Sequence, residues 1–402
     1  MSPDIIQAKK SLTAAMCAVL LSCIGISLPY PILAPYFIHE YTPLTQYLGL
    51  PPKLLLGIVL AVYPLGVLFG SAIIGAASDI WGRKTTLLTT LFFSALGYIG
   101  SVFAFVYDSF PLLILTRFIT GFCEGNISVA KAIAVDLSPT LDKVRTFSLI
   151  NATGYAGWLL GPLLGGLLQP FGIEFVFMIA VVITFCALLS IWWLLPTESK
   201  KIAGNSSILR LISKQNSFLL LNHSDLKSIF LIYLLATLGL NAYYEFYPLL
   251  LAEQFHFTSP QIGMITAVLT TFMIITSIYG VTKIKQHWGL VNGSIIGLSL
   301  LTSALVLHNF IPGQFIWPYY ALVGVCIAVF NGFIPVYISD RYSELGQGQL
   351  MGLVTTTFSL ANVIIALAGS VIAIIDTRWS ISFGALLAFI STLLFIAHTK
   401  KE

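Results

Sequence analysis

Three charged side chains lie within one apolar run of the sequence, residues 110–136. Arg117, Glu124 and Lys131 are spaced by seven residues, and two turns of an α-helix return to nearly the same face. If the run crosses a bilayer, a charge at its centre costs about 2.5–3.5 kcal/mol on insertion scales. The stripe is therefore expected to face protein or an aqueous cavity. Glu124 would lie near the middle of the span, with Arg117 on the same helix face. A carboxyl in this position is suited to binding and releasing a proton. The alternative is a static ladder of ion pairs that fixes the helix.

A second acid lies inside another apolar stretch, "GLNAYYEFYP" at 239–248. Asn241 and Glu245 are four residues apart and would share a helix face. Tyr244 is one of four aromatic residues around them. One interpretation is an aromatic binding wall with an acid for a cationic group or a proton. The other is an aromatic belt at the outer membrane interface.

The composition shows what kind of element must carry these groups. The chain has 402 residues, of which 57% are hydrophobic and only 9% are charged. A soluble protein of this size averages about 25% charged residues, so the chain is expected to be embedded in lipid. No basic run is long enough to indicate nucleic acid binding. The five cysteines lack metal-ligand spacing, so neither a metal nor a cofactor is expected.

Twelve apolar runs are long enough to span a bilayer as helices. The sequence therefore predicts an all-α membrane protein with an N-terminal bundle of six helices at 1–195 and a C-terminal one at 227–402, joined by a polar cytoplasmic linker at 196–226. The predicted spans are 11–38, 53–77, 85–107, 110–136, 145–170, 174–195, 227–252, 260–282, 290–310, 315–339, 349–374 and 379–398.

The distribution of basic residues predicts the orientation of the spans. With the N-terminus inside, 16 of the 20 Lys and Arg residues fall in inner segments and only two, Lys53 and Arg378, in outer ones. Cytoplasmic loops carry the excess of positive charge in membrane proteins. Both termini are therefore expected in the cytoplasm.

The two halves also resemble each other at a shift of about 204 residues. Gly121 then matches Gly324, and Asp136 matches Asp340 at the inner end of the equivalent span. Two six-helix halves in the same orientation are typical of transporters built from parallel repeats, in which the substrate site lies near the midplane.

The loop after the second span, "GAASDIWGRK", combines glycines with charges. Gly75 would allow close packing of the helix end, and Gly82 would allow a tight turn. Asp79 can pair with a cation, while Arg83 and Lys84 can meet a carboxylate or the C-terminus of a helix.

This loop resembles the signature loop of the major facilitator superfamily, with Ile80 where members often carry Arg. The weakened second copy, "TKIKQHWG", also fits that family. The resemblance implies the major facilitator fold. It also implies that the loop is a gate latch that stabilises one state of the transporter, usually the outward-facing one.

Two further stretches resemble the proton-antiporter branch of the family. "LTRFITGFCEG" at 115–125 resembles its span-4 motif, with Thr120 in place of the usual Gln. "GYAGWLLGPLLGG" at 154–166 resembles its span-5 motif, although generic packing of small residues would give a similar pattern. The residues that carry the second likeness are Gly154, Gly157, Gly161, Pro162 and Gly165.

"GISLPYPILAP" at 25–35 resembles the first span of tetracycline/proton antiporters, with Ser22 where those carry an acid. In this family spans 1, 4, 7 and 10 line the cavity. The resemblance therefore implies Tyr30, Glu124, Glu245 and Asn331 as candidates from each of these spans.

We therefore expect a proton-coupled exporter of a small organic compound, drug-like or amphipathic, acting as a monomer in a bacterial inner membrane. Its partners would be its substrate, protons and the lipid bilayer. The alternative is an importer or facilitator of a nutrient, metabolite or metal chelate with the same fold. An enzyme is not expected, because the sequence contains no HExxH, GxSxG or phosphate-loop motif.

Overall fold

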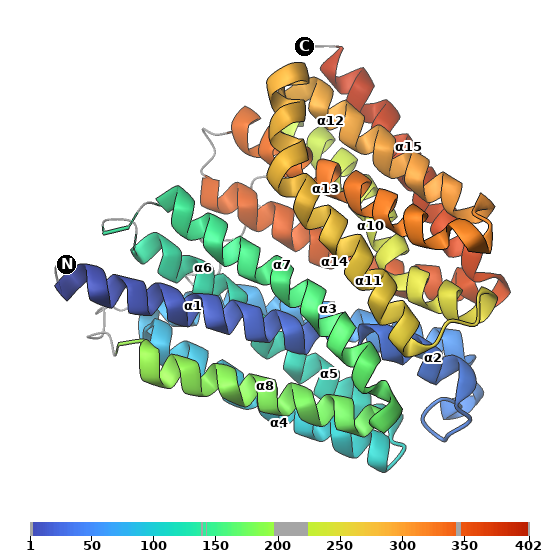
Figure 1. The fold of residues 1–402 in the computed structure, drawn as a ribbon, viewed down its shortest axis with the longest axis horizontal. Helices are drawn as coiled ribbons and strands as arrows, with labels where there is room; N and C mark the ends of the chain where they lie inside the picture. Colours follow the sequence, from blue (N-terminus) through green and yellow to red (C-terminus); the bar gives the residue numbers. More distant parts are fainter. Residues whose placement is uncertain (1–2, 138–139, 142, 197–223, 343–346, 401–402) are drawn as a thin grey trace. The chain divides into compact units, whose positions relative to one another are not determined.

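The computed structural model describes residues 3–137, 140–141, 143–196, 224–342 and 347–400, and over these ranges the chain is helical without a strand (Figure 1). The helices of the first half are α1 (Pro3–Ser27), α2 (Tyr30–His39), α3 (Pro52–Trp81), α4 (Arg83–Val106), α5 (Phe110–Glu124), α6 (Ile127–Asp136), α7 (Lys143–Leu168) and α8 (Ile173–Leu194). Those of the second half are α10 (Ser224–Gln254), α11 (Ser259–Ile275), α12 (Val281–Leu307), α13 (Ile316–Arg341), α14 (Gln347–Ile375) and α15 (Thr377–Thr399). Short turns of other helix types are η1 (Tyr47–Gly49), η2 (Gln169–Phe171), η4 (Thr276–Gly280), η5 (His308–Phe310) and η6 (Gly313–Phe315).

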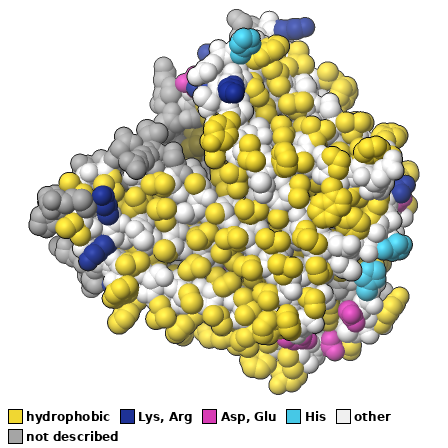
Figure 2. Space-filling model, viewed as in Figure 1, with side chains coloured by type: hydrophobic (Ala, Val, Ile, Leu, Met, Phe, Trp, Pro, Cys, Tyr) yellow, Lys and Arg dark blue, Asp and Glu magenta, His cyan; other side chains and the backbone are white. Residues whose placement is uncertain are grey.

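The helices have the length and composition of membrane spans. Ten helical stretches in the described part of the chain are long and apolar enough to cross a bilayer. One of them, Ser259–Phe310, covers two predicted spans, and α7 is not among the ten, so the count is compatible with twelve. Hydrophobic side chains cover most of the face shown in Figure 2. The chain is thus a multi-pass integral membrane protein.

The chain divides into two compact units. The first contains residues 1–33, 41–48 and 62–215, and the second contains 34–40, 49–61 and 216–402. The N-terminal end of α3 therefore belongs to the second unit, although it comes from the first half of the sequence. The predicted linker at 196–226 lies outside the described residues except at its two ends.

In the first unit α1 packs against α7 and α8, and α4 packs against α5 and α8. Glycines set the contact between α1 and α7. A Cβ added at Gly157, Gly161 or Gly165 would collide with atoms of α1 or of the residue that follows it. The predicted glycine stripe thus lies where two helix backbones approach closely. Pro162 lies within α7, between two of these glycines.

In the second unit α10 packs against α14 and α15, α12 against α13 and α15, and α11 against α13. The N-terminal end of α3 is held in this unit by Lys53. Its ammonium group lies 2.8 Å from a carboxylate oxygen of Glu253 and donates to the carbonyl of Ala373 at 2.8 Å. The hydroxyl of Thr377 donates to the other carboxylate oxygen of Glu253. Lys53 and Glu253 therefore each have a further hydrogen-bond partner besides each other.

The repeat found in the sequence corresponds to an equivalent contact in each unit. A Cβ at Gly121 of α5 would collide with the carbonyl oxygen of Tyr63 in α3. A Cβ at Gly324 of α13 would collide in the same way with the carbonyl of Leu269 in α11. Each unit therefore uses one glycine to bring the corresponding pair of helices together.

Two of the predicted spans are interrupted. The span at 110–136 consists of α5 and α6, which are separated at Gly125 and Asn126. The span at 11–38 consists of α1 and α2, with a break at Leu28 and Pro29. At the first break the backbone N–H groups of Gly125 and Asn126 still donate, to the carbonyls of Phe122 and Cys123.

Candidate functional site

Glu124 is the last residue of α5, directly before the break, and its side chain is only 3% exposed. Three hydroxyl groups donate to its carboxyl. Tyr98 donates to Oε1 at 2.7 Å and Ser94 donates to the same oxygen at 3.1 Å. Tyr63 donates to Oε2. A buried carboxyl with hydroxyl donors on both oxygens can be held in the ionised form. When the carboxyl is protonated, one of the same hydroxyls can accept the hydrogen bond that the carboxyl O–H donates.

The donors are positioned by two helices that flank α5. Ser94 and Tyr98 are four residues apart in α4 and therefore lie on one face of that helix. Tyr63 is in α3, and its backbone lies against Gly121 of α5. Because a side chain at Gly121 would push α3 away, this glycine permits the hydroxyl of Tyr63 to reach Glu124.

Arg117 lies two turns before Glu124 on α5 and is 2% exposed. Its guanidinium carbon is 4.6 Å from the centre of the Tyr63 ring, which is a cation–π contact. Its Nε and Nη1 atoms are buried without a hydrogen-bond partner among the described residues. The ring of Tyr63 thus lies between the two charged side chains that the sequence singled out.

Lys131 does not continue the same buried stripe. It belongs to α6, beyond the break, and its side chain is exposed. A helix that stops at Glu124 does not preserve the spacing of seven across the break. The three charges therefore do not form one ladder on a single helix.

Sequence reasoning did not identify Tyr63, Ser94 or Tyr98. The signal that could have found them is the pair Ser94 and Tyr98, because two polar residues four apart in an apolar span lie on one helix face and can share a partner. Tyr63 gives no comparable signal, since its partner is known only once α3 is placed against α5.

The stretch around Glu245 lies in α10. Asn241 and Glu245 are both buried, and Asn241 donates to the carbonyl of Phe358 in α14 at 3.2 Å. Tyr244 is partly buried, and its hydroxyl lies 3.9 Å from the sulfur of Met273. Acid and amide therefore share a buried face of α10, as their spacing predicts.

The other aromatic residues of this stretch do not form an exposed belt. Tyr243 and Tyr247 stack with a centroid distance of 5.3 Å and contact Tyr320 of α13. His308 packs edge-on against Tyr243 and lies 3.2 Å from the hydroxyl of Tyr319. These rings belong to the interior of the second unit, so a belt at the membrane interface does not describe them.

The remaining cavity candidates are Tyr30 and Asn331. Tyr30 begins α2, is partly buried, and contacts Trp158 of α7 edge-on with a centroid distance of 5.7 Å. Asn331 of α13 is exposed.

The loop between α3 and α4 contains an ion-pair network. Arg83 donates to Asp79 at 2.6 Å and to Asp136 of α6 at 3.0 Å. Lys84 donates to the carbonyl of Trp192 near the C-terminus of α8 at 2.8 Å. Gly82 has a φ of 90°, which favours glycine. A Cβ at Gly75 would meet only the Ser128 hydroxyl, at 3.9 Å.

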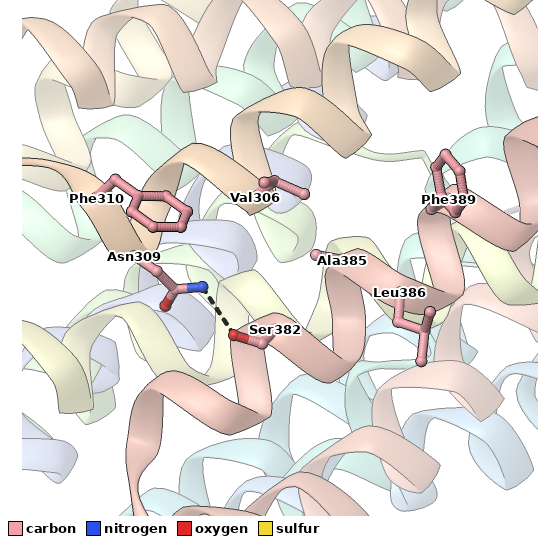
Figure 3. Close-up of a pocket in the computed structure, with 7 residues that line it drawn as sticks. All are labelled: Val306, Asn309, Phe310, Ser382, Ala385, Leu386 and Phe389. Atoms are coloured by element: carbon pink, nitrogen blue, oxygen red, sulfur yellow. Dashed lines mark hydrogen bonds between the residues drawn. The ribbon is translucent and has the colours of Figure 1, made fainter.

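An apolar pocket of about 370 Å³ lies in the second unit between the end of α12, η5 and α15 (Figure 3). Its polar lining residues are Asn309 and Ser382, which bond to each other at 2.7 Å. The other lining residues are Val306, Phe310, Ala385, Leu386 and Phe389. Since none of the seven side chains titrates, this pocket has no group that could carry a proton.

Comparison with known proteins gives two kinds of match. Residues 15–226 and 229–402 match the family model of the Major Facilitator Superfamily. The class H tetracycline resistance protein of Pasteurella multocida is 24% identical over 361 residues, covering 88% of this chain and 86% of that protein. The quinolone resistance protein NorA of Staphylococcus aureus is 25% identical over 355 residues, covering 86% of this chain and 85% of that protein.

Solved structures share the fold. The nucleoside transporter NupG superposes with a TM-score of 0.75 at 14% identity and covers 97% of this chain and 98% of its own. The human organic anion transporter MFSD10 superposes with a TM-score of 0.70 at 20% identity, covering 98% of this chain and all of its own.

Proposed function

Because this chain belongs to the Major Facilitator Superfamily, we propose that it exports a small organic compound in exchange for protons, by alternating access. Relatives that match most of its length are named for resistance to tetracycline and to quinolones. These names support a drug-like or amphipathic substrate rather than a nutrient. The bacterial sources of these relatives support a place in a bacterial inner membrane.

One observation carries the proton-coupling part of the proposal. Glu124 is a buried carboxyl at a helix break, and the groups bonded to it are three hydroxyls rather than a fixed cation. An acid paired directly with Arg or Lys would stay ionised, whereas hydroxyls can stabilise both protonation states. Glu124 is therefore the proposed proton carrier, with Arg117 as the nearby charge and Glu245 as a second buried acid.

The other predicted residues have supporting roles in this proposal. Tyr30, Asn241, Tyr244 and Asn331 remain the proposed substrate contacts. The close contact of Gly157, Gly161 and Gly165 with α1 supports a packing role for the antiporter-like stretch. The ion pairs of Arg83 with Asp79 and Asp136 support a latch at the inner loop.

The test uses inside-out membrane vesicles, with tetracycline and a quinolone as probes. An acidic interior should drive uptake of a probe, with proton exit that a pH-sensitive dye reports. Glu124→Gln is close to the protonated acid in shape and charge and should abolish gradient-driven uptake. Glu174→Gln, at the start of α8, removes an acid outside the site and should leave uptake unchanged.

Three results would contradict the proposal. If proton exit still accompanies probe uptake in Glu124→Gln as in the wild type, Glu124 is excluded as the proton carrier. Probe movement that is indifferent to the pH gradient would indicate a facilitator. Failure to move either probe would contradict the substrate class.

A further inference from the structure

The two buried charges of α5 do not contact each other along the helix. Arg117 and Glu124 are seven residues apart, which corresponds to about 10 Å along the axis. Two side-chain nitrogens of Arg117, Nε and Nη1, are buried without a hydrogen-bond partner among the described residues, whereas both oxygens of Glu124 are bonded. If these groups influence each other beyond simple charge attraction, another side chain must connect them.

Tyr63 contacts both groups. Its hydroxyl donates to Oε2 of Glu124, and its ring lies under the guanidinium of Arg117 at 4.6 Å. Its place is fixed by the close contact of α3 with α5, where a Cβ at Gly66 or Gly121 would collide with the facing backbone. Since neither helix can move closer, the ring is held between the two charged groups.

We infer that Tyr63 is a positioning residue that couples Arg117 to the charge on Glu124; this inference rests on the proposed function, in which Glu124 carries the proton. A phenol that donates to a carboxylate gains electron density on its ring, which strengthens the cation–π contact. When a proton binds Glu124, the hydroxyl loses an ionised acceptor and the ring attracts Arg117 less. The guanidinium, with N–H groups already lacking partners, is then free to bind another acceptor.

Tyr98 provides an internal comparison. It donates to the other oxygen of the same carboxyl at 2.7 Å and is fully buried. The guanidinium lies over the ring of Tyr63, so the connection through a ring is assigned to Tyr63. Removing either hydroxyl should affect proton binding, but only removal at Tyr63 should change how Glu124 responds to Arg117.

Other titratable groups near the carboxyl must be held constant in the test. Cys123 lies next to it on α5, and Cys23 of α1 is within electrostatic range. Lys131 of α6 is within range of Cys23. All three side chains stay unchanged in every variant used.

The experiment is an infrared pH titration of purified protein in lipid nanodiscs, which needs no substrate. The carbonyl stretch of the protonated carboxyl is followed, and the band that Glu124→Gln removes is assigned to Glu124. Tyr63→Phe and Tyr98→Phe should each raise the pH midpoint by about one unit, because each removes a donor to a charged acceptor. Arg117→Gln should also raise it, since a nearby positive charge favours the carboxylate.

The double variants decide the role of Tyr63. The shift in Tyr63→Phe/Arg117→Gln should be clearly smaller than the sum of the single shifts. In the matched pair Tyr98→Phe/Arg117→Gln the shifts should add, because charge attraction through space acts in both backgrounds. Additive shifts in both pairs, or an unchanged midpoint in Tyr63→Phe, would overturn the coupling role.

Two further results keep the test decisive. If Tyr63→Phe does not fold, Tyr63 can be replaced by 3-fluorotyrosine, which keeps the shape and makes the hydroxyl a stronger donor. The pH midpoint of Glu124 should then fall. An unchanged midpoint would overturn the inference. If the titrating band persists in Glu124→Gln, Glu124 is not the proton carrier, and the proposed function and this inference both fail. Loss of the band with additive shifts would overturn the inference alone.

Discussion

At the scale of residues, the charged side chains of the loop between α3 and α4 have different partners from those of α5. Arg83 is bonded to two carboxylates that are partly open to solvent, whereas Glu124 is buried among hydroxyls. Ion pairs near water can break and re-form at little cost, because water solvates the separated charges. The loop is therefore suited to a contact that is made and released, and Glu124 to a group whose protonation changes.

The loop gives a prediction on Asp79. Asp79→Asn removes one partner of Arg83, so we expect slower transport and a shift of the population toward the inward-open state. The free energy of unfolding should change by less than about 1 kcal/mol, because the Asp79 side chain is 40% exposed. Tetracycline uptake in vesicles, spin-label distances and thermal unfolding measure the three effects.

The control is Lys84→Gln, in the same loop. Lys84 is bonded to the Trp192 carbonyl rather than to an acid, so its loss should leave the state population unchanged. An unchanged distance distribution together with normal transport in Asp79→Asn would show that the loop contributes only to topology.

At the scale of elements, the approach of α3 to α5 determines whether the site exists. Glycines on both helices bring the backbones together, and Tyr63 reaches Glu124 only because of this. The chemistry of the site therefore depends on residues that have no side chain.

A pair of glycine substitutions tests this dependence. Gly121→Ala would place a methyl group against the carbonyl of Tyr63, and overpacking of this kind costs about 1–3 kcal/mol. Proton binding should change with it, because Tyr63 would be displaced. Gly154→Ala meets its nearest atom at 3.7 Å, in ordinary contact, and should be neutral or stabilise α7 by up to about 1 kcal/mol.

Denaturant unfolding of both purified variants gives the comparison. An equal loss of stability in the two variants would show that the close contact does not matter.

The elements also show what the sequence can predict. Apolar length located the helices, because a bilayer requires about 20 apolar residues for each span. It could not reveal the break at Gly125 and Asn126, since an interrupted span is as apolar as a continuous one. Glu124 was found by its charge, but Tyr63 and Tyr98 could not be assigned to it, because a neutral hydroxyl in an apolar run does not indicate which helix it faces.

At the scale of the whole molecule, the two units share a packing device but not its chemistry. Gly121 and Gly324 make the same kind of close contact. The residue three positions later is Glu124 in the first unit and the apolar Ile327 in the second. The repeat thus accounts for the fold, and only the first unit carries an acid at this position.

The orientation of the molecule is tested by thiol labelling in a Cys186→Ser background, which removes the exposed native cysteine. Gln286→Cys lies near the start of α12 and Gln314→Cys lies in η6, beyond the end of α12, and both positions are exposed. An impermeant reagent should label position 314 in intact cells, and position 286 only after permeabilisation. Labelling of both from one side would contradict the predicted orientation.

Burial of its acids gives the protein a selective chemical vulnerability. Among the described residues, Glu124 and Glu245 are the acids buried in the interior. Lipophilic carbodiimides enter membranes and react with carboxyl groups in their protonated form. The reagent would therefore find Glu124 while it carries its proton and convert it into a permanently neutral adduct. The step that loads the transporter would also be the step that exposes it to covalent inhibition.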